Sequence, residues 1–332
     1  MAKQISLTGI KPTGVPHIGN YFGAIKPALE LAEMYDARYF IADYHALNSM
    51  KDPEELRRMI YEVAATWLAC GLDPDKVLFY RQSAIPETFE LSTNLMAFTP
   101  KGLMNRAHAY KAMVQSNLEN DRDPDDRVNM GLYTYPVLMA ADILLFDSDV
   151  VPVGKDQIQH LEMTIDIAET INKTYKSDCL VIPKPITSEV TQTIVGMDGR
   201  KMSKSYGNTI PLFLPSKKLR KMVMKIVTNS QTVEEPKDPE TCSVFTLFKL
   251  FAGENEQIEL ANRYRAGGMG WGDAKQTLYE AMERALAPMR DVYDSYISNT
   301  DELDRILKEG AEKARPIASE TLKRVRNATG LY

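Results

Sequence analysis

The sequence has 332 residues, of which 44% are hydrophobic and 26% charged, and its formal net charge is −5. This is the composition of an ordinary globular protein with room for two compact domains, and its negative charge argues against a protein that coats nucleic acid indiscriminately. The first ten residues lack a secretory signal. The longest apolar stretch, around Val137 to Phe146, is interrupted by Asp142 and is too short to span a bilayer. We therefore expect a soluble, cytoplasmic protein with no membrane partner.

Cysteine and histidine residues give no indication of a metal site. The three cysteines lie far apart and form no CxxC pair, and none of the four histidines pairs at the spacing of metal ligands. We predict neither a disulfide framework nor a structural metal.

The first quarter of the chain alternates strand-like and helix-like segments. The predicted elements are a strand at Gln4–Leu7, a loop at Gly9–Pro16, a helix at Ile18–Tyr35, a strand at Ala37–Asp43, a helix from Asp52 to Cys70 and a strand at Val77–Tyr80. The helix at Asp52 has the clearest start, with an N-cap residue, Pro53 at the first position and acids in the first turn. This alternation predicts an α/β fold with a parallel sheet, helices on both faces, and ligands at the carboxyl ends of the strands.

The remaining sequence is mostly helical in pattern. A helical stretch at Glu87–Gln115 breaks near Thr99-Pro100, and Asn120–Asp126 is a polar, charged loop. The later predicted elements are helices at Leu132–Phe146 and Gln157–Lys173, a Gly- and Lys-rich loop at Gly196–Asn208, and helices at Ser216–Val227, Asn255–Ala266, Asp273–Tyr296 and Asp301–Ala328. Everything after Pro215 is predicted to be helical, so an α/β front and an all-α back meet near residues 205–215.

A glycine-bearing loop, GIKPTGVPHIGN at residues 9–20, joins the first predicted strand to the first helix. This junction places backbone amides at a helix N-terminus, which suits a phosphate, and Gly9, Gly14 and Gly19 would allow a close approach to a ligand. The loop contains neither GxGxxG nor GxxxxGK[ST]. Taken alone it is weak evidence, because many α/β proteins have such a turn for packing reasons.

A second loop, GRKMSKS at Gly199–Ser205, carries two lysines and two hydroxyls beside Arg200. Lysines are point charges on flexible stems, able to follow a polyphosphate as its charge shifts during transfer. Taken alone, the run fits a solvated loop or a nucleic-acid patch equally well.

Together, PHIGN at residues 16–20 and KMSKS at residues 201–205 resemble the paired signatures of class I aminoacyl-tRNA synthetases. Asn20 stands where the first signature has a second histidine, and asparagine can still donate a hydrogen bond. The stretch Tyr133–Leu145, VPVGKDQ at 151–157, TGIKPTG at 8–14, GMGWGDAK at 268–275 and the run beginning ASETL at 318–322 resemble the tryptophanyl-tRNA synthetase family. The resemblance spans essentially the whole chain.

The resemblance implies a domain architecture and a set of partners. Residues 1–210 would form a Rossmann-like domain that binds ATP and tryptophan, with a helical dimer-interface insertion at about 85–130, and residues 211–332 an all-α anticodon-binding domain. The expected activity is tryptophan–tRNA ligase, with L-tryptophan, ATP with Mg²⁺ and tRNA(Trp) as partners and a homodimer as the assembly. The candidate phosphate contacts for the tRNA are Arg263, Arg265, Lys218, Arg220 and Lys221.

The choice of amino acid depends on one helix face. Tyr135, Met139 and Asp142 are spaced i, i+4 and i+7, so a helix places them on one side. A buried carboxylate suits the single indole N–H donor, and a thioether packs well against an aromatic ring. The sister tyrosyl enzymes usually carry glutamine where Met139 stands. We therefore expect Asp142 to select tryptophan.

The other site residues are implied by the family. Tyr135 and Gln157 would hold the substrate ammonium group, with Gln82 close by. The residues expected at ATP are Lys11, Pro12, Thr13, Gly19, Asn20, Gly154, Lys155, Asp156, Lys201, Met202, Ser203, Lys204 and Ser205. The expected catalytic residues are Lys201 and Lys204, which would neutralise developing charge, His17, which would anchor the nucleotide, and Lys111, a third lysine.

Three alternatives stay open. A tyrosyl-tRNA synthetase is the nearest, and Met139 and the ADILL context count against it. Small-molecule nucleotidyltransferases also use a HIGH-like loop, but they rarely combine it with a KMSKS loop, a GxDQ element and a helical tail. A non-enzymatic RNA-binding relative would be expected to have lost some of these motifs, and all are intact here.

Overall fold

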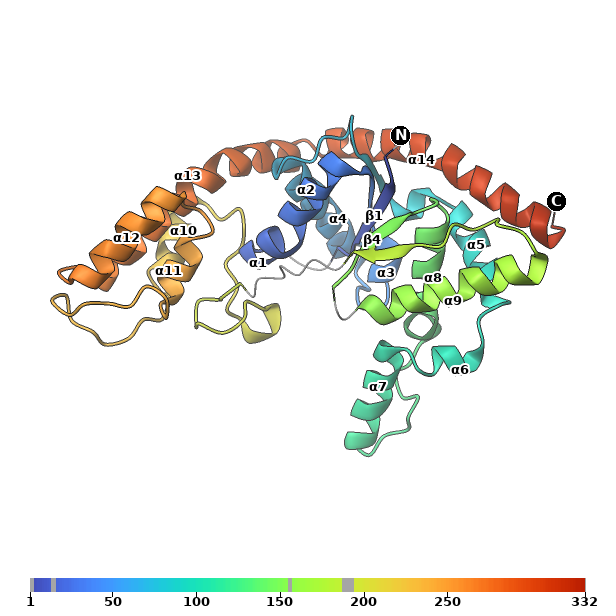
Figure 1. Cartoon of the computed structure of the whole chain (residues 1–332), viewed down its shortest axis with the longest axis horizontal. Helices are drawn as coiled ribbons and strands as arrows, with labels where there is room; N and C mark the ends of the chain where they lie inside the picture. The colour runs from blue at the N-terminus through green and yellow to red at the C-terminus, as the bar shows by residue number, and fades with distance from the viewer. Residues whose placement is uncertain (1–2, 13–15, 155–156, 187–193, 332) are drawn as a thin grey trace.

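The computed structural model describes residues 3–12, 16–154, 157–186 and 194–331, and a five-stranded parallel sheet lies at its centre (Figure 1). The strands, in spatial order, are β3 (Leu78–Arg81), β2 (Asp36–Ile41), β1 (Ile5–Ile10), β4 (Val150–Pro152) and β5 (Lys184–Ile186). The predicted α/β fold is confirmed, and the three predicted strands correspond to β1, β2 and β3. The strand order reverses at β1, between β2 and β4, and such a switch point opens a crevice for ligands.

β4 and β5 were not predicted from the sequence. Each strand has only three residues and each contains a proline, Pro152 at the end of β4 and Pro185 inside β5. Proline cannot donate to a sheet ladder and is confined to strand ends and edge strands, which is where both prolines lie. A three-residue strand with a proline carries too little alternation to be recognised.

Both faces of the sheet are covered by helices, as predicted. On one face, Tyr39 of β2 packs edge-on against Trp67 of α4 (Pro53–Ala69), with ring centroids 5.4 Å apart. On the other face, Phe40 stacks on Tyr80 of β3 at 5.7 Å, in the apolar cluster that also contains α8 (Met130–Leu144). Successive residues of β2 therefore enter two separate cores, as the twofold period of a strand requires.

The helix predicted at Ile18–Tyr35 forms as one continuous run with an irregular centre. It consists of α1 (Ile18–Asn20), a π-helical turn (Tyr21–Ile25) and α2 (Lys26–Met34). Pro27 lies in the first turn of α2 and has no backbone N–H, so the wider turn before it avoids a clash of the proline ring with a preceding carbonyl. The predicted N-cap of α4 is confirmed, because the Asp52 carboxylate accepts from the amides of Glu54 and Glu55 at 2.9 and 3.2 Å.

The middle of the chain adds five helices of 4 to 18 residues. These are α3 (Asp43–Ala46), α5 (Glu87–Met96), α6 (Lys101–Met104), α7 (His108–Glu119) and α9 (Ile158–Tyr175). The break near Thr99-Pro100 is confirmed, but a second break occurs before α7. There the His108 amide donates to the Gln159 side chain at 2.9 Å, and Gln159 donates to the Arg106 carbonyl at 3.1 Å. A contact between distant segments interrupts the helix, so local sequence could not predict it.

The back of the chain is helical, with one exception. Its helices are α10 (Ser216–Val223), α11 (Ser243–Phe248), α12 (Glu254–Ala266), α13 (Trp271–Ser298) and α14 (Thr300–Thr329). The prediction of helix throughout is wrong at residues 224–242, which form turns and irregular structure, and α11 was not predicted. Buried Lys237 organises this segment by donating to the carbonyls of Thr232 and Glu235 at 2.7 and 3.1 Å.

The two last helices run as a long arc across the molecule (Figure 1). α13 packs on α4, and α14 crosses β3 and α5. The Arg315 side chain of α14 pairs with Glu87 at the start of α5 at 3.0 Å, and Gly310 lies directly against the backbone of Phe79 in β3. The C-terminal helix thus returns to the sheet.

Candidate active site

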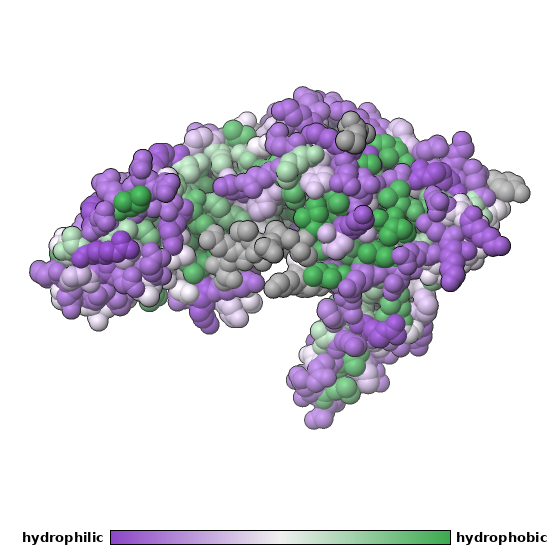
Figure 2. Space-filling view, in the orientation of Figure 1, coloured by the Kyte–Doolittle hydropathy of each residue, from purple (hydrophilic) through white to green (hydrophobic). Residues whose placement is uncertain are grey.

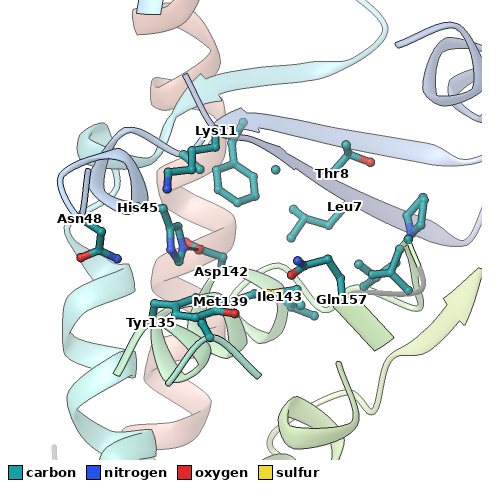
Figure 3. A pocket seen from close by; sticks show the side chains of 18 of the residues that line it. Leu7, Thr8, Lys11, His45, Asn48, Tyr135, Met139, Asp142, Ile143 and Gln157 are labelled. Atoms are coloured by element: carbon teal, nitrogen blue, oxygen red, sulfur yellow. Dashed lines mark hydrogen bonds and ion pairs between the residues drawn. The ribbon is translucent and has the colours of Figure 1, made fainter. Parts of the chain in front are cut away.

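A cavity of about 490 Å³ opens at the carboxyl ends of β1 and β4, at the switch point of the sheet (Figure 3). Lys11, directly after β1, and Gly154, shortly after β4, lie on its wall. The neighbouring protein atoms partly desolvate the Lys11 ammonium group and lower its pKa. The cavity is therefore where the α/β topology places a ligand site.

One wall of the cavity is the face of α8. Tyr135, Met139 and Asp142 all line it, as their i, i+4, i+7 spacing predicts, and Figure 3 shows them on the same side of the helix. Asp142 is only 3% exposed, and this burial raises the pKa of its carboxyl group. The α8 face thus combines a phenol, a thioether and a buried acid around one apolar space.

Two side chains hold the Asp142 carboxylate. Gln82 Nε2 donates to both of its oxygens at 2.9 and 2.8 Å, and His45 Nε2 lies 2.9 Å from Oδ2. Gln82 is itself fully buried, so it reaches the cavity through Asp142 and does not line its wall. These contacts fix the carboxylate and lower its pKa against the dominant effect of burial.

A second carboxylate fixes the segment that carries His45. Asp43 Oδ1 accepts from the amides of Tyr44 at 3.1 Å and Ser83 at 3.0 Å, and the Ser83 hydroxyl donates to Oδ2. The Tyr44 amide also donates to Gln82 Oε1 at 3.1 Å. The sequence analysis missed both Asp43 and His45. Their position directly after β2, at the ligand-binding edge of the sheet, is the only indication in the sequence.

Tyr135 and Gln157 meet at a second histidine, His160. The Tyr135 hydroxyl hydrogen-bonds to the ring of His160, and Gln157 Oε1 lies 3.0 Å from His160 Nδ1. His160 is 2% exposed and lies on α9, so a buried ring orients two side chains of the cavity wall. His160 was also not predicted as a site residue.

The first glycine loop leads into α1 through His17. The His17 side chain accepts from the Asn20 amide at 3.3 Å, while the Asn20 side chain accepts from the His17 amide at 3.0 Å. This reciprocal cap fixes the Asn20 side chain at the start of α1. Burial and the nearby positive charge of Lys204 lower the pKa of His17 to about 4, so the ring is neutral near pH 7.

The lysine-bearing loop lies against this helix start. The Gly19 amide donates to Met202 Sδ at 3.3 Å, although 183 residues separate the two in sequence. The Ile18 amide donates to the Ile210 carbonyl at 3.0 Å, which joins the chain after the loop to the same helix. Partial desolvation lowers the pKa of Lys204, and its charge in turn lowers that of His17. The two predicted signatures therefore form one site.

The remaining predicted residues are distributed unevenly. Lys201, Lys204 and Ser205 are exposed on the second loop, and Pro12 is buried after β1. Lys111 lies on α7 and is not part of the cavity wall, although Ala109 of the same helix is. Thr13, Lys155 and Asp156 lie outside the described residues. Within the described chain no helix is long and apolar enough to cross a membrane, and no three His, Cys, Asp or Glu side chains are grouped as metal ligands.

A histidine-capped helix start that receives a KMSKS loop beside a parallel sheet defines a class of enzyme, the class I aminoacyl-tRNA synthetases. The family model described as class I tRNA synthetases (W and Y) matches residues 2–287. The tryptophan–tRNA ligase of Bordetella parapertussis is 52% identical over 328 residues, which cover 98% of this chain and 72% of the relative. That of Neisseria meningitidis serogroup A is 48% identical over 334 residues, covering 100% and 99%.

A solved structure agrees with these relatives. The crystal structure of tryptophanyl-tRNA synthetase from Campylobacter jejuni, complexed with ADP and tryptophan, matches 99% of this chain and 100% of its own with a TM-score of 0.90 and 43% identity. The chain belongs to the tryptophanyl-tRNA synthetase family, and the prediction made from its motifs is confirmed.

Proposed function

We propose that this chain activates L-tryptophan with ATP to form tryptophanyl-adenylate and transfers the amino acid to tRNA(Trp). Family membership supports the reaction, and the buried Asp142 carboxylate on the cavity wall is the observation that carries the choice of tryptophan. An ionised carboxylate has about four acceptor positions. Gln82 and His45 use three of them among the described residues, which leaves one on Oδ1 for the indole N–H.

The rest of the cavity suits the amino-acid substrate. Met139 and Ile143 provide an apolar surface for an aromatic ring. The Tyr135 hydroxyl and the Gln157 carbonyl oxygen are both acceptors that could bind an ammonium group. Because His160 contacts both side chains, we assign it the role of orienting them.

ATP would bind where the two loops meet. We assign its phosphates to Gly19 and Asn20 at the start of α1, with Pro12 and Thr13 before them, and to the KMSKS residues Met202, Ser203 and Ser205. Gly154, Lys155 and Asp156 are assigned to the nucleoside, with Asp156 at the ribose hydroxyls. Lys11 lines the cavity, and we assign its ammonium group to ATP or the substrate carboxylate. Neutral His17 would anchor the nucleotide as a hydrogen-bonding group, without charge.

The reaction needs no protein nucleophile. The tryptophan carboxylate attacks the α-phosphorus of ATP and pyrophosphate leaves. A ribose hydroxyl at the 3′ end of the tRNA then attacks the carbonyl carbon of the mixed anhydride, and AMP leaves. Catalysis would come from aligning two anions and neutralising charge that develops on the leaving group. We assign that neutralisation to Lys201 and Lys204 together with the Mg²⁺ of the ATP complex, and a supporting role to Lys111.

We further propose a cytoplasmic homodimer with a catalytic domain at residues 1–210 and an anticodon-binding domain at residues 211–332. The insertion at about 85–130 contains α7, which projects from the body, and apolar atoms are visible on this projection in Figure 2. Leu118 at the end of α7 and Met130 at the start of α8 are 52% and 68% exposed. Exposed large apolar side chains on a projecting element favour contact with a second subunit.

Aminoacylation tests the whole proposal. Purified protein is incubated with ATP, Mg²⁺, total tRNA and labelled tryptophan, and acid-stable label on the tRNA is measured. We expect charging that depends on ATP and is not competed by excess tyrosine. Charging with labelled tyrosine instead would support the tyrosyl alternative, and adenylate formation without any charging would support a small-molecule nucleotidyltransferase.

A further inference from the structure

Asn208 is a buried polar residue just outside the KMSKS motif. It is 3% exposed, whereas Lys201, Lys204 and Ser205 beside it are exposed. Its side chain makes three hydrogen bonds within the loop. Oδ1 accepts from the Ser203 amide at 2.8 Å, and Nδ2 donates to the Lys201 carbonyl at 3.0 Å and to Asp198 Oδ1 at 2.7 Å. One amide therefore binds backbone on both sides of Met202.

Asp198 extends this network to the residues that precede Lys201 in the loop. Its carboxylate pairs with Arg200 at 2.6 Å and accepts from the Arg200 amide at 3.1 Å. The Arg200 guanidinium lies over the Tyr206 ring, 4.7 Å from its centroid. The hydrogen bond from Asn208 and the interaction with Arg200 hold the pKa of Asp198 at about 2, so this anchor stays ionised. The hydrogen bond between Asp198 and Asn208 thus joins the segment before Lys201 to the segment after Lys204.

The backbone around Asn208 is shaped to admit it. The Met197 amide donates to the Asn208 carbonyl at 3.0 Å, and the Gly196 amide donates to the Arg200 carbonyl at 2.7 Å. A Cβ atom on Gly196 would lie 2.8 Å from the Asn208 carbonyl oxygen and closer still to its side-chain amide. Only glycine at position 196 leaves this space. The loop's shape therefore depends on this polar contact together with the burial of Met202 at its centre.

We propose that Asn208 is the positioning residue of the lysine loop: it fixes the backbone between Lys201 and Ser203, so that both lysine side chains approach the ATP phosphates from one preformed arrangement. This inference rests on the proposed function. A preorganised loop backbone loses less conformational freedom when it engages a ligand, while the flexible lysine side chains can still follow the phosphate charge during transfer. Without the amide, the Met202 amide still donates to the Ile194 carbonyl at 2.7 Å, but the backbone at Ser203 loses its hydrogen bond and the approach of Lys204 is less well defined.

The test is Asn208→Ala in tryptophan-dependent ATP–pyrophosphate exchange. We expect kcat to fall between about 10- and 100-fold, as for other displacements of catalytic groups by about an ångström. The KM for tryptophan should not change, because α8 forms the amino-acid site. In a Lys204→Ala background the same substitution should have a much smaller effect, since Asn208 acts through the lysines. An equal loss in both backgrounds would overturn the proposal.

Asn172 provides a matched control. Its side chain also ties a loop, donating to the Leu180 carbonyl at 2.8 Å and accepting from the Leu180 amide at 3.1 Å, but it lies on α9 away from the two motifs. Asn172→Ala should lower the melting temperature and leave kcat unchanged. If Asn172→Ala lowered kcat as much as Asn208→Ala, the effect would be general destabilisation and the proposal would be wrong.

Limited trypsin digestion adds a readout that needs no activity. Asn208→Ala should be cleaved several-fold faster than wild type at Lys201 and Lys204, whereas Asn172→Ala should be cleaved there at the wild-type rate. A protein that showed this difference but no amino-acid-dependent exchange would contradict the proposed function and not the role of Asn208. Wild-type cleavage of a folded Asn208→Ala protein would contradict the positioning role.

A charge exchange covers the case in which Asn208→Ala does not fold. Asn208→Asp removes both donors and places a second carboxylate beside Asp198, so kcat should fall at least as far as in the alanine variant. Adding Asp198→Asn lets the new amide at position 198 donate to the new carboxylate at position 208, which reverses the donor and acceptor of the original hydrogen bond. Part of the lost kcat should then return. No recovery in the double variant would count against the proposal.

Discussion

Replacing Asp142 by asparagine tests how this enzyme selects tryptophan. The substitution keeps the size of the side chain, and Oδ1 can still accept from Gln82 and from an indole N–H. Nδ2 takes the place of Oδ2, where it loses the hydrogen bond from Gln82 and can donate to His45 if that ring nitrogen accepts. What the indole N–H loses is the charge of its acceptor. A hydrogen bond to a charged group contributes about 1.5–3 kcal/mol and a neutral one about 0.5–1.5 kcal/mol, so the expected loss is about 1–1.5 kcal/mol. That corresponds to about a 5- to 13-fold fall in kcat/KM for tryptophan.

The assay compares tryptophan with an analogue whose indole N–H is replaced by sulfur. In wild type, kcat/KM in pyrophosphate exchange should favour tryptophan, and Asp142→Asn should reduce that preference by the same factor of about 5 to 13. Asp142→Ala should remove the whole interaction, roughly 10- to 150-fold. Discrimination against phenylalanine and tyrosine should weaken in the same order. An unchanged preference in Asp142→Asn would refute the assignment of Asp142 to the indole N–H.

Protein stability provides the control for this series. Burial raises the pKa of Asp142 in the native state above that of an aspartate in the unfolded chain. Between these two pKa values the native state therefore binds the proton more readily than the unfolded chain does. The contribution of this group to stability therefore falls as pH rises through its native pKa. Asp142→Asn loses the hydrogen bond from Gln82 to Oδ2 but no longer buries a charge, so its melting temperature near pH 7.5 should lie close to the wild-type value. A reduced kcat/KM in that variant would then reflect lost recognition.

Three further predictions concern the two loops and the C-terminal helix. Lys204→Ala should slow adenylate formation in a single turnover far more than it weakens tryptophan binding, and an unaltered single-turnover rate would exclude a catalytic role for Lys204. Burial and Lys204 depress the pKa of His17 to about 4, so the unfolded state gains a proton first as pH falls from about 6.5 towards 4, and the free energy of unfolding decreases over that window. His17→Asn should make this decrease with pH shallower in urea titrations. An unchanged pH dependence would contradict the depressed pKa. Gly310→Ala would overlap the Phe79 carbonyl, so α14 should be displaced from β3 at a cost of about 1–3 kcal/mol or more in denaturant unfolding, and wild-type stability would show that α14 does not pack there.

The sequence predicts the parts of the fold that repeat a local pattern. Apolar runs, capping groups and helical periodicity, each visible in the local sequence, predict three strands, one N-cap and two long helices. These are β1, β2 and β3, the N-cap at Asp52, and α13 and α14. β4 and β5 do not, because three residues with a proline resemble a loop. Residues 224–242 read as helical because they lie among helices, yet buried Lys237 and its carbonyl partners hold them in turns.

The site divides in the same way. Helix spacing alone places Tyr135, Met139 and Asp142 on one cavity wall, and family motifs identify the two loops. The contacts that orient those groups join residues with no local relation in sequence: His45 and Asp142 are 97 positions apart, and Gln82 and Asp142 are 60 apart. Only the folded sheet edge brings them together. The groups that we assign to the substrates are therefore easier to predict from the sequence than the groups that position them.

The measurement that tests the central claim most directly is ATP–pyrophosphate exchange with each of the twenty amino acids offered singly. The cavity described above predicts exchange that depends on tryptophan, with every other amino acid, tyrosine included, supporting little or none at the same concentration. Exchange that is fastest with tyrosine would contradict the assignment of tryptophan to the Asp142 pocket. Exchange with no amino acid at all would contradict the proposed activation chemistry itself.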